Sequence, residues 1–193
     1  MSLLVRFGNA LGAGGLAFVL ALGLVFQFAL HELPCPLCNL QRVAFALCGL
    51  GFVLNLRFGA QPYHYGFVLL SALFGLAASG RQVLLHIVPG SGSYGSPILG
   101  MHFYSWALVL FLAVIAGSAI LLVLSGTGRF DYHRSDALAA ERFEGFPRLM
   151  AYVLIVMVFA NALVTFAQCG PVECADDPAG YWIVQYLPNF MLR

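Results

Sequence analysis

The stretch Cys35-Pro36-Leu37-Cys38-Asn39-Leu40-Gln41-Arg42 interrupts two long apolar runs and organises the sequence around it. Two cysteines separated by two residues can close a disulfide or share a metal, and one thiol of such a motif often has a lowered pKa. Arg42 follows Cys38 by four residues, so guanidinium and sulfur share one face if a helix has resumed there. A permanent cation beside a thiol favours the thiolate, the nucleophile of disulfide exchange. The motif therefore predicts a redox site at a membrane surface.

The composition is that of an integral membrane protein. Hydrophobic residues make up 61% of the 193 residues and charged residues 9%, whereas about a quarter of a soluble domain is charged. The net charge of +1 gives no reason to expect a nucleic-acid partner. Arg6 and the apolar run after it resemble a signal peptide, but no small-x-small cleavage site precedes the polar break, so we expect no cleavage.

Five apolar runs are candidates for crossing the lipid bilayer, which takes about 20 helical residues for roughly 30 Å of hydrocarbon. The second, Val43 to Leu56, is short and spans only if the arginines that flank it snorkel to the interface. Pro147 stands just before the fifth run as a helix-start signal. We therefore expect an all-α, antiparallel bundle in one membrane domain over residues 1–193. Its spans are expected at about 10–30, 41–57, 64–85, 103–125 and 148–168, followed by a tail over 169–193.

Arginine counts in the loops orient this bundle, because cytoplasmic loops carry the excess of basic residues. One face holds six arginines, and the other holds three. The six are Arg6, Arg57, Arg129, Arg134, Arg142 and Arg148, and the three are Arg42, Arg81 and Arg193. The amino terminus is therefore expected in the cytoplasm and the carboxyl terminus outside, in the periplasm of a bacterium. The end of the outer tail, Tyr181 to Leu192, is expected to lie on the membrane surface.

The five cysteines form two close pairs, Cys35/Cys38 and Cys169/Cys174, with Cys48 alone in the second span. The predicted orientation places both pairs on the outer face, where thiols are oxidised. Closing a C-x-x-C loop gains little entropy, so stabilisation alone explains the first pair poorly. A Gly-Pro turn favours contact between the second two sulfurs, and a local disulfide that pins the tail is the structural alternative there. Cys48 is expected to be a small buried hydrophobe.

Arg42 and Arg81 are the cations nearest the outer ends of neighbouring antiparallel spans. A charge set into a membrane is costly and marks a functional site by default, although Arg81 can equally snorkel to headgroups. His86, about one turn further on, is either a donor to a bound cofactor or an interface histidine. Two thiols release two electrons, and the acceptor available in lipid is a quinone, whose developing negative charge Arg42 can stabilise. Arg42, Arg81 and His86 are thus the candidate cofactor-binding residues.

Two other functions compete with a thiol relay to quinone. Four outer cysteines can bind zinc as four thiolates, although an oxidising compartment removes the thiolates that such a site needs. The relay can also run inward, as a membrane thiol reductase, but that needs a redox group at the cytoplasmic face, where the sequence has none.

On these motifs the chain resembles the DsbB family of disulfide-bond formation proteins. The resemblance covers roughly residues 10–125, and the C-x-x-C-x-x-x-R element carries it, together with Gly80-Arg81-Gln82 and His86. It implies a four-helix core and an inner-membrane enzyme that re-oxidises a periplasmic, thioredoxin-fold DsbA-like partner and passes the electrons to ubiquinone or menaquinone. It also implies that Cys35 receives electrons from the second pair, that Cys38 faces the quinone, and that Arg42 lines the quinone pocket.

The second cysteine pair departs from the family pattern. Family members typically carry it between the third and fourth spans, but here that loop, His86 to His102, has no cysteine. The chain therefore resembles a five-span branch in which Cys169 and Cys174 take that place. Cys174 lies farther from the membrane, among acidic residues, so we expect the partner's thiolate to attack Cys174 and the released Cys169 to attack Cys35.

Overall fold

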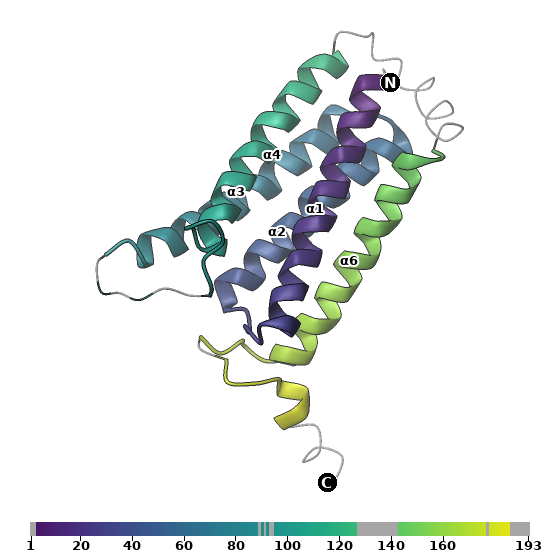
Figure 1. Cartoon of the computed structure of the whole chain (residues 1–193). Helices are drawn as coiled ribbons and strands as arrows, with labels where there is room; N and C mark the ends of the chain where they lie inside the picture. Colours follow the sequence, from purple (N-terminus) through teal and green to yellow (C-terminus); the bar gives the residue numbers. More distant parts are fainter. Residues whose placement is uncertain are drawn as a thin grey trace.

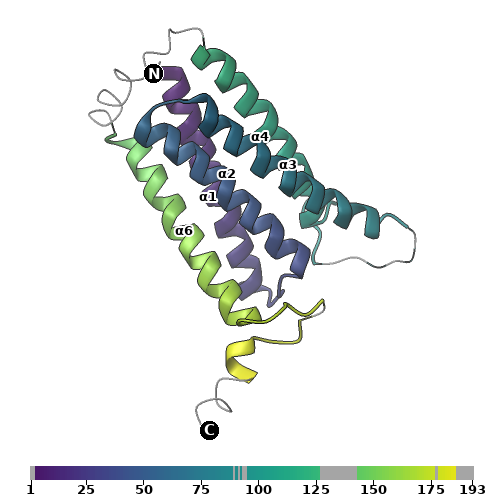
Figure 2. The ribbon, with the colours of Figure 1, turned by 180° about the vertical axis from the view of Figure 1, so that it is seen from behind.

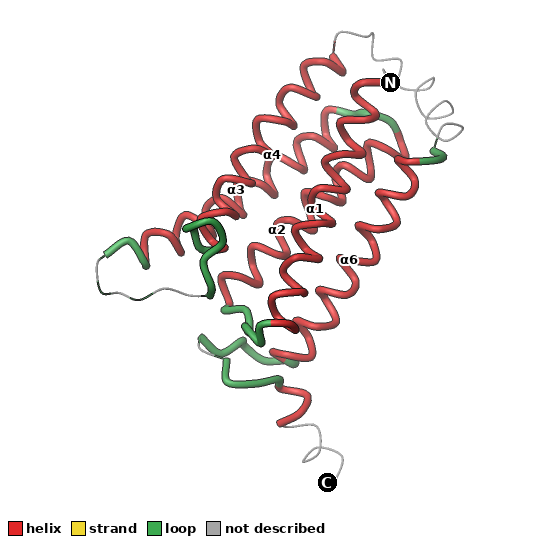
Figure 3. The backbone as a smooth tube through the Cα atoms, viewed as in Figure 1, coloured by secondary structure: helices red, strands yellow, loops and turns green. Residues whose placement is uncertain are grey.

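The computed structural model describes residues 3–88, 90, 92, 95–126, 143–176 and 178–185 of the chain. These residues fold into five long helices that run up and down beside one another (Figure 1). The helices are α1 (Leu3–Ala29), α2 (Pro36–Phe58), α3 (Pro62–Leu85), α4 (Phe103–Gly126) and α6 (Phe146–Cys169). Each is long and apolar enough to cross a membrane, and the described ranges hold no strand (Figure 3). The prediction of an all-α membrane bundle with five spans is confirmed.

α2 begins at Pro36, several residues before the apolar run that predicted it. The Sγ atom of Cys35 caps the helix by accepting a hydrogen bond from the backbone N of Cys38 at 3.2 Å, and proline at the start has no N–H to satisfy. The helix has 23 residues, about 35 Å at helical rise, which is ample for a span. The C-x-x-C motif therefore forms the N-cap, Cys35, and the first turn of α2 rather than part of a loop.

α2 lies at the centre of the bundle, against α1, α3 and α6 and touching α4. α3 packs along α4 and α1 packs along α6, whereas α1 and α4 meet only sparsely. The rings of Phe45 and Phe111 stack with centroids 4.1 Å apart and join α2 to α4. Gly75 of α3 makes room for this stack, because a Cβ atom there would overlap the Phe111 ring. Close packing at small residues is how membrane helices associate without a hydrophobic driving force.

A buried hydrogen-bond network ties α1, α2 and α3 together at the end where the chain starts. Asn9 donates its Nδ2 to the Tyr65 hydroxyl at 2.7 Å, and Asn55 donates to the Asn9 Oδ1 at 3.0 Å. The Nδ1 of His64 lies 3.1 Å from the Asn55 Oδ1. All four side chains are buried, so these bonds set the rotation and register of the three helices.

Successive helices run in opposite directions. The α1–α2 loop, the α3–α4 connection and the tail after α6 therefore lie at the end of the bundle away from the start of α1 (Figures 1 and 2). The end of α3 and its connection to α4 lean to one side of the bundle there. By their places in the helices, Arg6, Arg57 and Arg148 lie at the end where α1 starts, and Arg42 and Arg81 at the other. Arg129, Arg134, Arg142, Arg193 and residues 186–192 lie outside the described residues. The side of the membrane that each end faces stays a prediction.

Candidate active site

The first cysteine pair lies at the buried start of α2. The Sγ atoms of Cys35 and Cys38 are 2.6 Å apart, close enough for the pair to alternate between dithiol and disulfide. Gln82 of α3 donates its Nε2 toward both sulfurs, at 3.4 and 3.5 Å. The Oε1 of Gln82 accepts a hydrogen bond from the Nε2 of Gln41 at 2.8 Å, which fixes the amide in this orientation. An amide donor aimed at both sulfurs stabilises negative charge on whichever one carries it.

The two sulfurs differ in their surroundings. Cys35 precedes the helix and is 8% exposed. The hydrogen bond shared with the Cys38 sulfur, and then burial, raise the pKa of Cys35 well above its ordinary value. Cys38 lies in the first turn of α2, where the helix N-terminus and Arg42, one turn later, favour negative charge. Cys38 is thus the sulfur placed to carry a thiolate, and Cys35 is the one that keeps its proton.

The Arg42 guanidinium is held by α1. Its Nη1 donates to the Oε1 of Gln27 at 2.7 Å, and its Nη2 donates to the backbone oxygen of Gly23 at 2.9 Å. Within the described ranges these two oxygens are its bonded partners. The other N–H groups of the guanidinium, which has five, therefore remain for a ligand.

An apolar cavity of about 600 Å³ lies between α1 and α4, where these helices meet sparsely, with α2 at its base. Its polar lining gathers near the cysteines, where Cys38, Gln41 and Arg42 contribute to the wall. Gly15 and Gly117 line the two long walls and face open space, because a Cβ atom added at either would meet nothing within 4 Å. The cavity is therefore polar at the cysteine end and apolar along its length.

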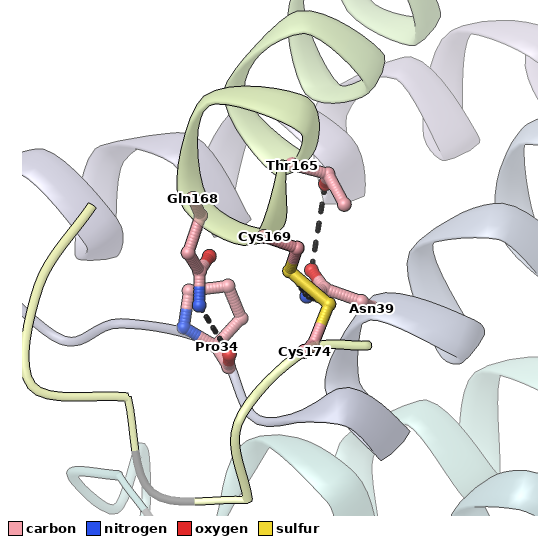
Figure 4. Close-up of a disulfide and its surroundings, with 6 residues drawn as sticks. All are labelled: Pro34, Asn39, Thr165, Gln168, Cys169 and Cys174. Carbon is pink, nitrogen blue, oxygen red and sulfur yellow. Dashed lines mark hydrogen bonds between the residues drawn. A yellow bond between two sulfur atoms is a disulfide. The ribbon is translucent and has the colours of Figure 1, made fainter. Parts of the chain in front are cut away.

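The second cysteine pair is a disulfide between Cys169, the last residue of α6, and Cys174 (Figure 4). Gly170 reverses the chain with a φ of 67°, a conformation that favours glycine. The expectation that a Gly-Pro turn brings these two sulfurs together is confirmed. Cys169 is buried and Cys174 is half-buried, so Cys174 is the more accessible sulfur of the disulfide.

Asn39, which the sequence reasoning did not select, lies beside the tail disulfide (Figure 4). It directly follows Cys38, and its Nδ2 lies 3.8 Å from the Sγ atoms of both Cys169 and Cys174. Its Oδ1 accepts a hydrogen bond from the Thr165 hydroxyl at 3.5 Å, which turns the amide donor toward the disulfide. The signal in the sequence was a polar residue in the first turn of a membrane helix, a place where polar groups are costly. In the structure only 6% of the Asn39 side chain is exposed.

A second contact holds the end of α6 against the first pair. Gln168 donates its Nε2 to the backbone oxygen of Pro34 at 2.8 Å, and Pro34 directly precedes Cys35 (Figure 4). A residue directly next to each pair thus contacts the segment that carries the other pair. Asn39 follows Cys38, and Gln168 precedes Cys169.

Three other residues singled out from the sequence are not brought to the sulfurs. Arg81 is exposed and does not line the cavity, because successive residues of a helix point about 100° apart and Gln82 takes the inward position. His86 bonds through its Nδ1 to the Gln82 backbone oxygen at 2.8 Å and stacks on Tyr104, which lines the cavity. His86 therefore lies behind the cavity wall. Cys48 is fully buried in α2, as expected.

Part of the chain is similar to a known protein family. Residues 5–94 match the family model described as disulfide bond formation protein DsbB. Over these residues, the chain is similar to the DsbB family. The matched part comprises nearly all of α1 with α2 and α3, and so it includes Cys35, Cys38 and Gln82. The disulfide at the end of α6 lies outside it.

Curated relatives carry the name disulfide bond formation protein B. The one from Pseudomonas syringae pv. tomato is 42% identical over 80 residues, 39% of this chain and 46% of that protein. One from Xylella fastidiosa is 30% identical over 93 residues, 45% of this chain and 54% of that protein. One from Nitrosomonas eutropha is 40% identical over 57 residues, 28% of this chain and 35% of that protein. The chain spans about half the length, or less, of these DsbB relatives. No solved structure matches it significantly.

Proposed function

We propose that the chain is a membrane thiol:quinone oxidoreductase that re-oxidises a periplasmic, thioredoxin-fold DsbA-like protein. One observation carries the proposal: two cysteine pairs meet at one end of the bundle, and one of them borders an apolar cavity beside a guanidinium. The proposed location is the inner membrane of a bacterium, with the amino terminus in the cytoplasm and both cysteine pairs at the periplasmic side.

The cavity suits a quinone from the membrane pool, ubiquinone or menaquinone. Its volume of about 600 Å³ lies within the range of about 300–1,000 Å³ typical of ligand pockets. The apolar walls of α1 and α4 fit an isoprenoid tail, and the unbonded N–H groups of Arg42 fit a carbonyl oxygen. A bound quinone would supply the oxidant, which takes two electrons and two protons from the Cys35/Cys38 dithiol.

The proposed relay begins at the tail disulfide. The partner's thiolate attacks Cys174, the more exposed sulfur, and Cys169 leaves as a thiolate. The Nδ2 of Asn39 lies near both sulfurs and stabilises the leaving one. Cys169 then attacks Cys35 of the oxidised first pair, and the Cys35–Cys38 bond breaks to release Cys38 as a thiolate.

Two further exchanges complete the transfer. The partner's second thiol displaces Cys174 from the mixed disulfide, so the partner leaves oxidised. Cys174 then attacks Cys169, which restores the tail disulfide and frees Cys35. In sum, one partner dithiol has become a disulfide, and the Cys35–Cys38 disulfide has become a dithiol. The tail disulfide is closed and the first pair is free. In the proposed relay, this combination corresponds to the step before electron transfer to the quinone.

The residues around the first pair prepare that last step. Arg42 holds positive charge at the polar end of the cavity, where it stabilises the Cys38 thiolate and developing charge on an acceptor. Gln82 donates to both sulfurs, so the charge stays stabilised when it moves between them. Cys35 keeps its proton until Cys38 has reacted, because its pKa is raised.

The two competing functions have less support in the geometry. Among the described residues, no group of three or more His, Cys, Asp or Glu side chains is placed to hold a metal ion. A disulfide between Cys169 and Cys174 also offers no thiolate to zinc. An inward thiol reductase needs a redox group at the other end of the bundle, but the fifth cysteine, Cys48, is buried within α2.

Quinone reduction by the purified chain tests the proposal. The protein is supplied with ubiquinone-1 or a short-chain menaquinone and a reduced thioredoxin-fold oxidoreductase, and loss of quinone absorbance is followed. We expect one quinone consumed per partner dithiol, no turnover in Cys38→Ser, and retained turnover in the control Cys48→Ala. A partner that is oxidised without any loss of quinone absorbance would contradict the proposal.

A further inference from the structure

Gln27 of α1 connects Arg42 to the tail. Its Oε1 accepts from Arg42 at 2.7 Å, and its Nε2 lies 3.1 Å from the hydroxyl of Tyr181. An arginine can only donate, so the amide oxygen must face Arg42 and the amide nitrogen must face Tyr181. Gln27 is 2% exposed, and so neither half of its amide has water as a ready substitute. The tail therefore contributes to the position of the guanidinium.

The tail is fastened close to Tyr181 at two points. The disulfide fixes where the chain goes after α6, seven residues before Tyr181. The ring of Trp182 packs on Gly170 so closely that a Cβ atom there would overlap it. Of these two fastenings, only the disulfide is opened by the proposed relay. Opening it restores conformational freedom to a chain segment that must be ordered for Tyr181 to reach Gln27.

We propose that Tyr181 is a positioning residue for the quinone site, acting through Gln27 on Arg42, and that it stays docked only while Cys169 and Cys174 are joined. The inference rests on the proposed function of the cavity as a quinone site. It makes quinone affinity highest when the tail disulfide has re-formed, which is when both electrons have reached Cys35 and Cys38. The tail thereby links quinone binding to a completed relay.

Equilibrium binding of ubiquinone-1 to the fully oxidised full chain tests the positioning role without turnover. We expect Tyr181→Phe to bind about fivefold more weakly, the equivalent of about 1 kcal/mol for one hydrogen bond. Tyr152→Phe is the matched control, since that tyrosine is exposed on α6 and contacts Arg148. Affinity of Tyr181→Phe equal to that of the wild type would overturn the role. If the wild type itself binds no ubiquinone-1, the proposed function fails instead.

A double-mutant cycle tests the link to the disulfide. The variant with both Cys169→Ala and Cys174→Ala keeps the first pair and mimics an open tail. We expect it to bind ubiquinone-1 about as weakly as Tyr181→Phe, and the triple variant to bind no more weakly than either. Additive losses would show that Tyr181 stays docked without the disulfide and would overturn the link.

Hydrogen exchange gives a readout that needs no quinone. Backbone amides of residues 181–185 should exchange faster in the double cysteine variant than in the wild type, because the tail is released. Amides of residues 63–68, at the far end of the bundle, should exchange equally in both and serve as the internal control. Unchanged exchange over residues 181–185 would overturn the redox link even if the quinone site itself is correct.

Discussion

Residues next to the two cysteine pairs contact one another's segments, yet the pairs are built differently. Cys35 and Cys38 lie at the start of a central helix, with an amide donor from α3 and an arginine one turn later. Cys169 and Cys174 close a chain reversal at the end of a peripheral helix, with the neutral amide of Asn39 between the sulfurs and the first pair. Cys35 and Cys38, called the inner pair below, are surrounded by groups that stabilise charge. Cys169 and Cys174, called the outer pair below, are surrounded by groups that leave one sulfur accessible.

Under the proposed function, this contrast predicts different roles for the two pairs. A sulfur that must hold a thiolate beside lipid needs fixed donors, because lipid offers none. A sulfur that must meet a protein partner needs access, which a turn supplies more readily than a helix core. We therefore expect changes at the inner pair to affect the quinone step and changes at the outer pair to affect partner exchange.

The strongest expected outcome is a trapped covalent complex. In Cys169→Ser, Cys174 is a lone thiol, so it is first activated as a mixed disulfide with thionitrobenzoate. The thiolate of a partner that keeps only its attacking cysteine then displaces thionitrobenzoate, and a disulfide between the partner and Cys174 should accumulate. Cys174→Ser should trap no partner, because the accessible sulfur is missing. Non-reducing gels and mass spectrometry of the linked peptides read the result. A complex that forms only when Cys169 is retained would reverse the order of the two cysteines.

The next largest expected effect is on quinone turnover, when the guanidinium beside the inner pair is removed. Arg42→Met should lower quinone turnover by about two to three orders of magnitude, since one donor to developing negative charge contributes about 3–4 kcal/mol. Disulfide exchange between the two pairs, followed by quenched thiol labelling, should stay largely intact. Arg57→Met is the control, because Arg57 lies at the other end of α2. Unchanged quinone kinetics in Arg42→Met would remove Arg42 from the site.

A smaller loss is expected for the amide that faces both inner sulfurs. Gln82→Leu removes the donors to Cys35 and Cys38 and should slow quinone turnover about 10- to 100-fold, as expected for hydrogen bonds to a charged group worth about 1.5–3 kcal/mol. Arg81→Met, the neighbouring change on the exposed face of α3, separates the two sides of this helix. If the Arg81 variant loses more turnover than the Gln82 variant, the inward face of α3 has been misassigned.

The smallest effect is expected between the pairs. Asn39→Leu removes one neutral donor near the tail disulfide and should slow exchange between the pairs about fivefold, with quinone binding unchanged. Thr165→Val, which removes only the hydroxyl that orients Asn39, should show a weaker effect of the same kind. Stopped-flow mixing of the oxidised protein with excess reduced partner measures the rate. An effect on quinone binding alone would place Asn39 with the inner pair.

Much of the fold follows from the sequence because hydropathy and helix period are local properties. Five apolar runs predicted five membrane helices, and the spacing of Cys38 and Arg42 predicted that they share a helix face once α2 was known to begin before them. The Gly-Pro turn predicted the closure of the tail disulfide for the same reason, since it depends on a few consecutive residues. The family match, which ends at residue 94, could not predict that closure.

The remaining features depend on how the helices rotate against one another, which no single segment contains. The rotation of α3 turned Gln82 toward the sulfurs and Arg81 away, although both stood in the same promising stretch. Contacts such as Asn9 with Tyr65 and Phe45 with Phe111 set those rotations, across long separations in sequence. By itself, then, the sequence determined the helices, the cysteine pairs and the neighbouring cation. Only tertiary packing decided the cavity between α1 and α4 and the contacts that Asn39, Gln27 and Tyr181 make, because each depends on side chains from separate helices or the tail meeting in space.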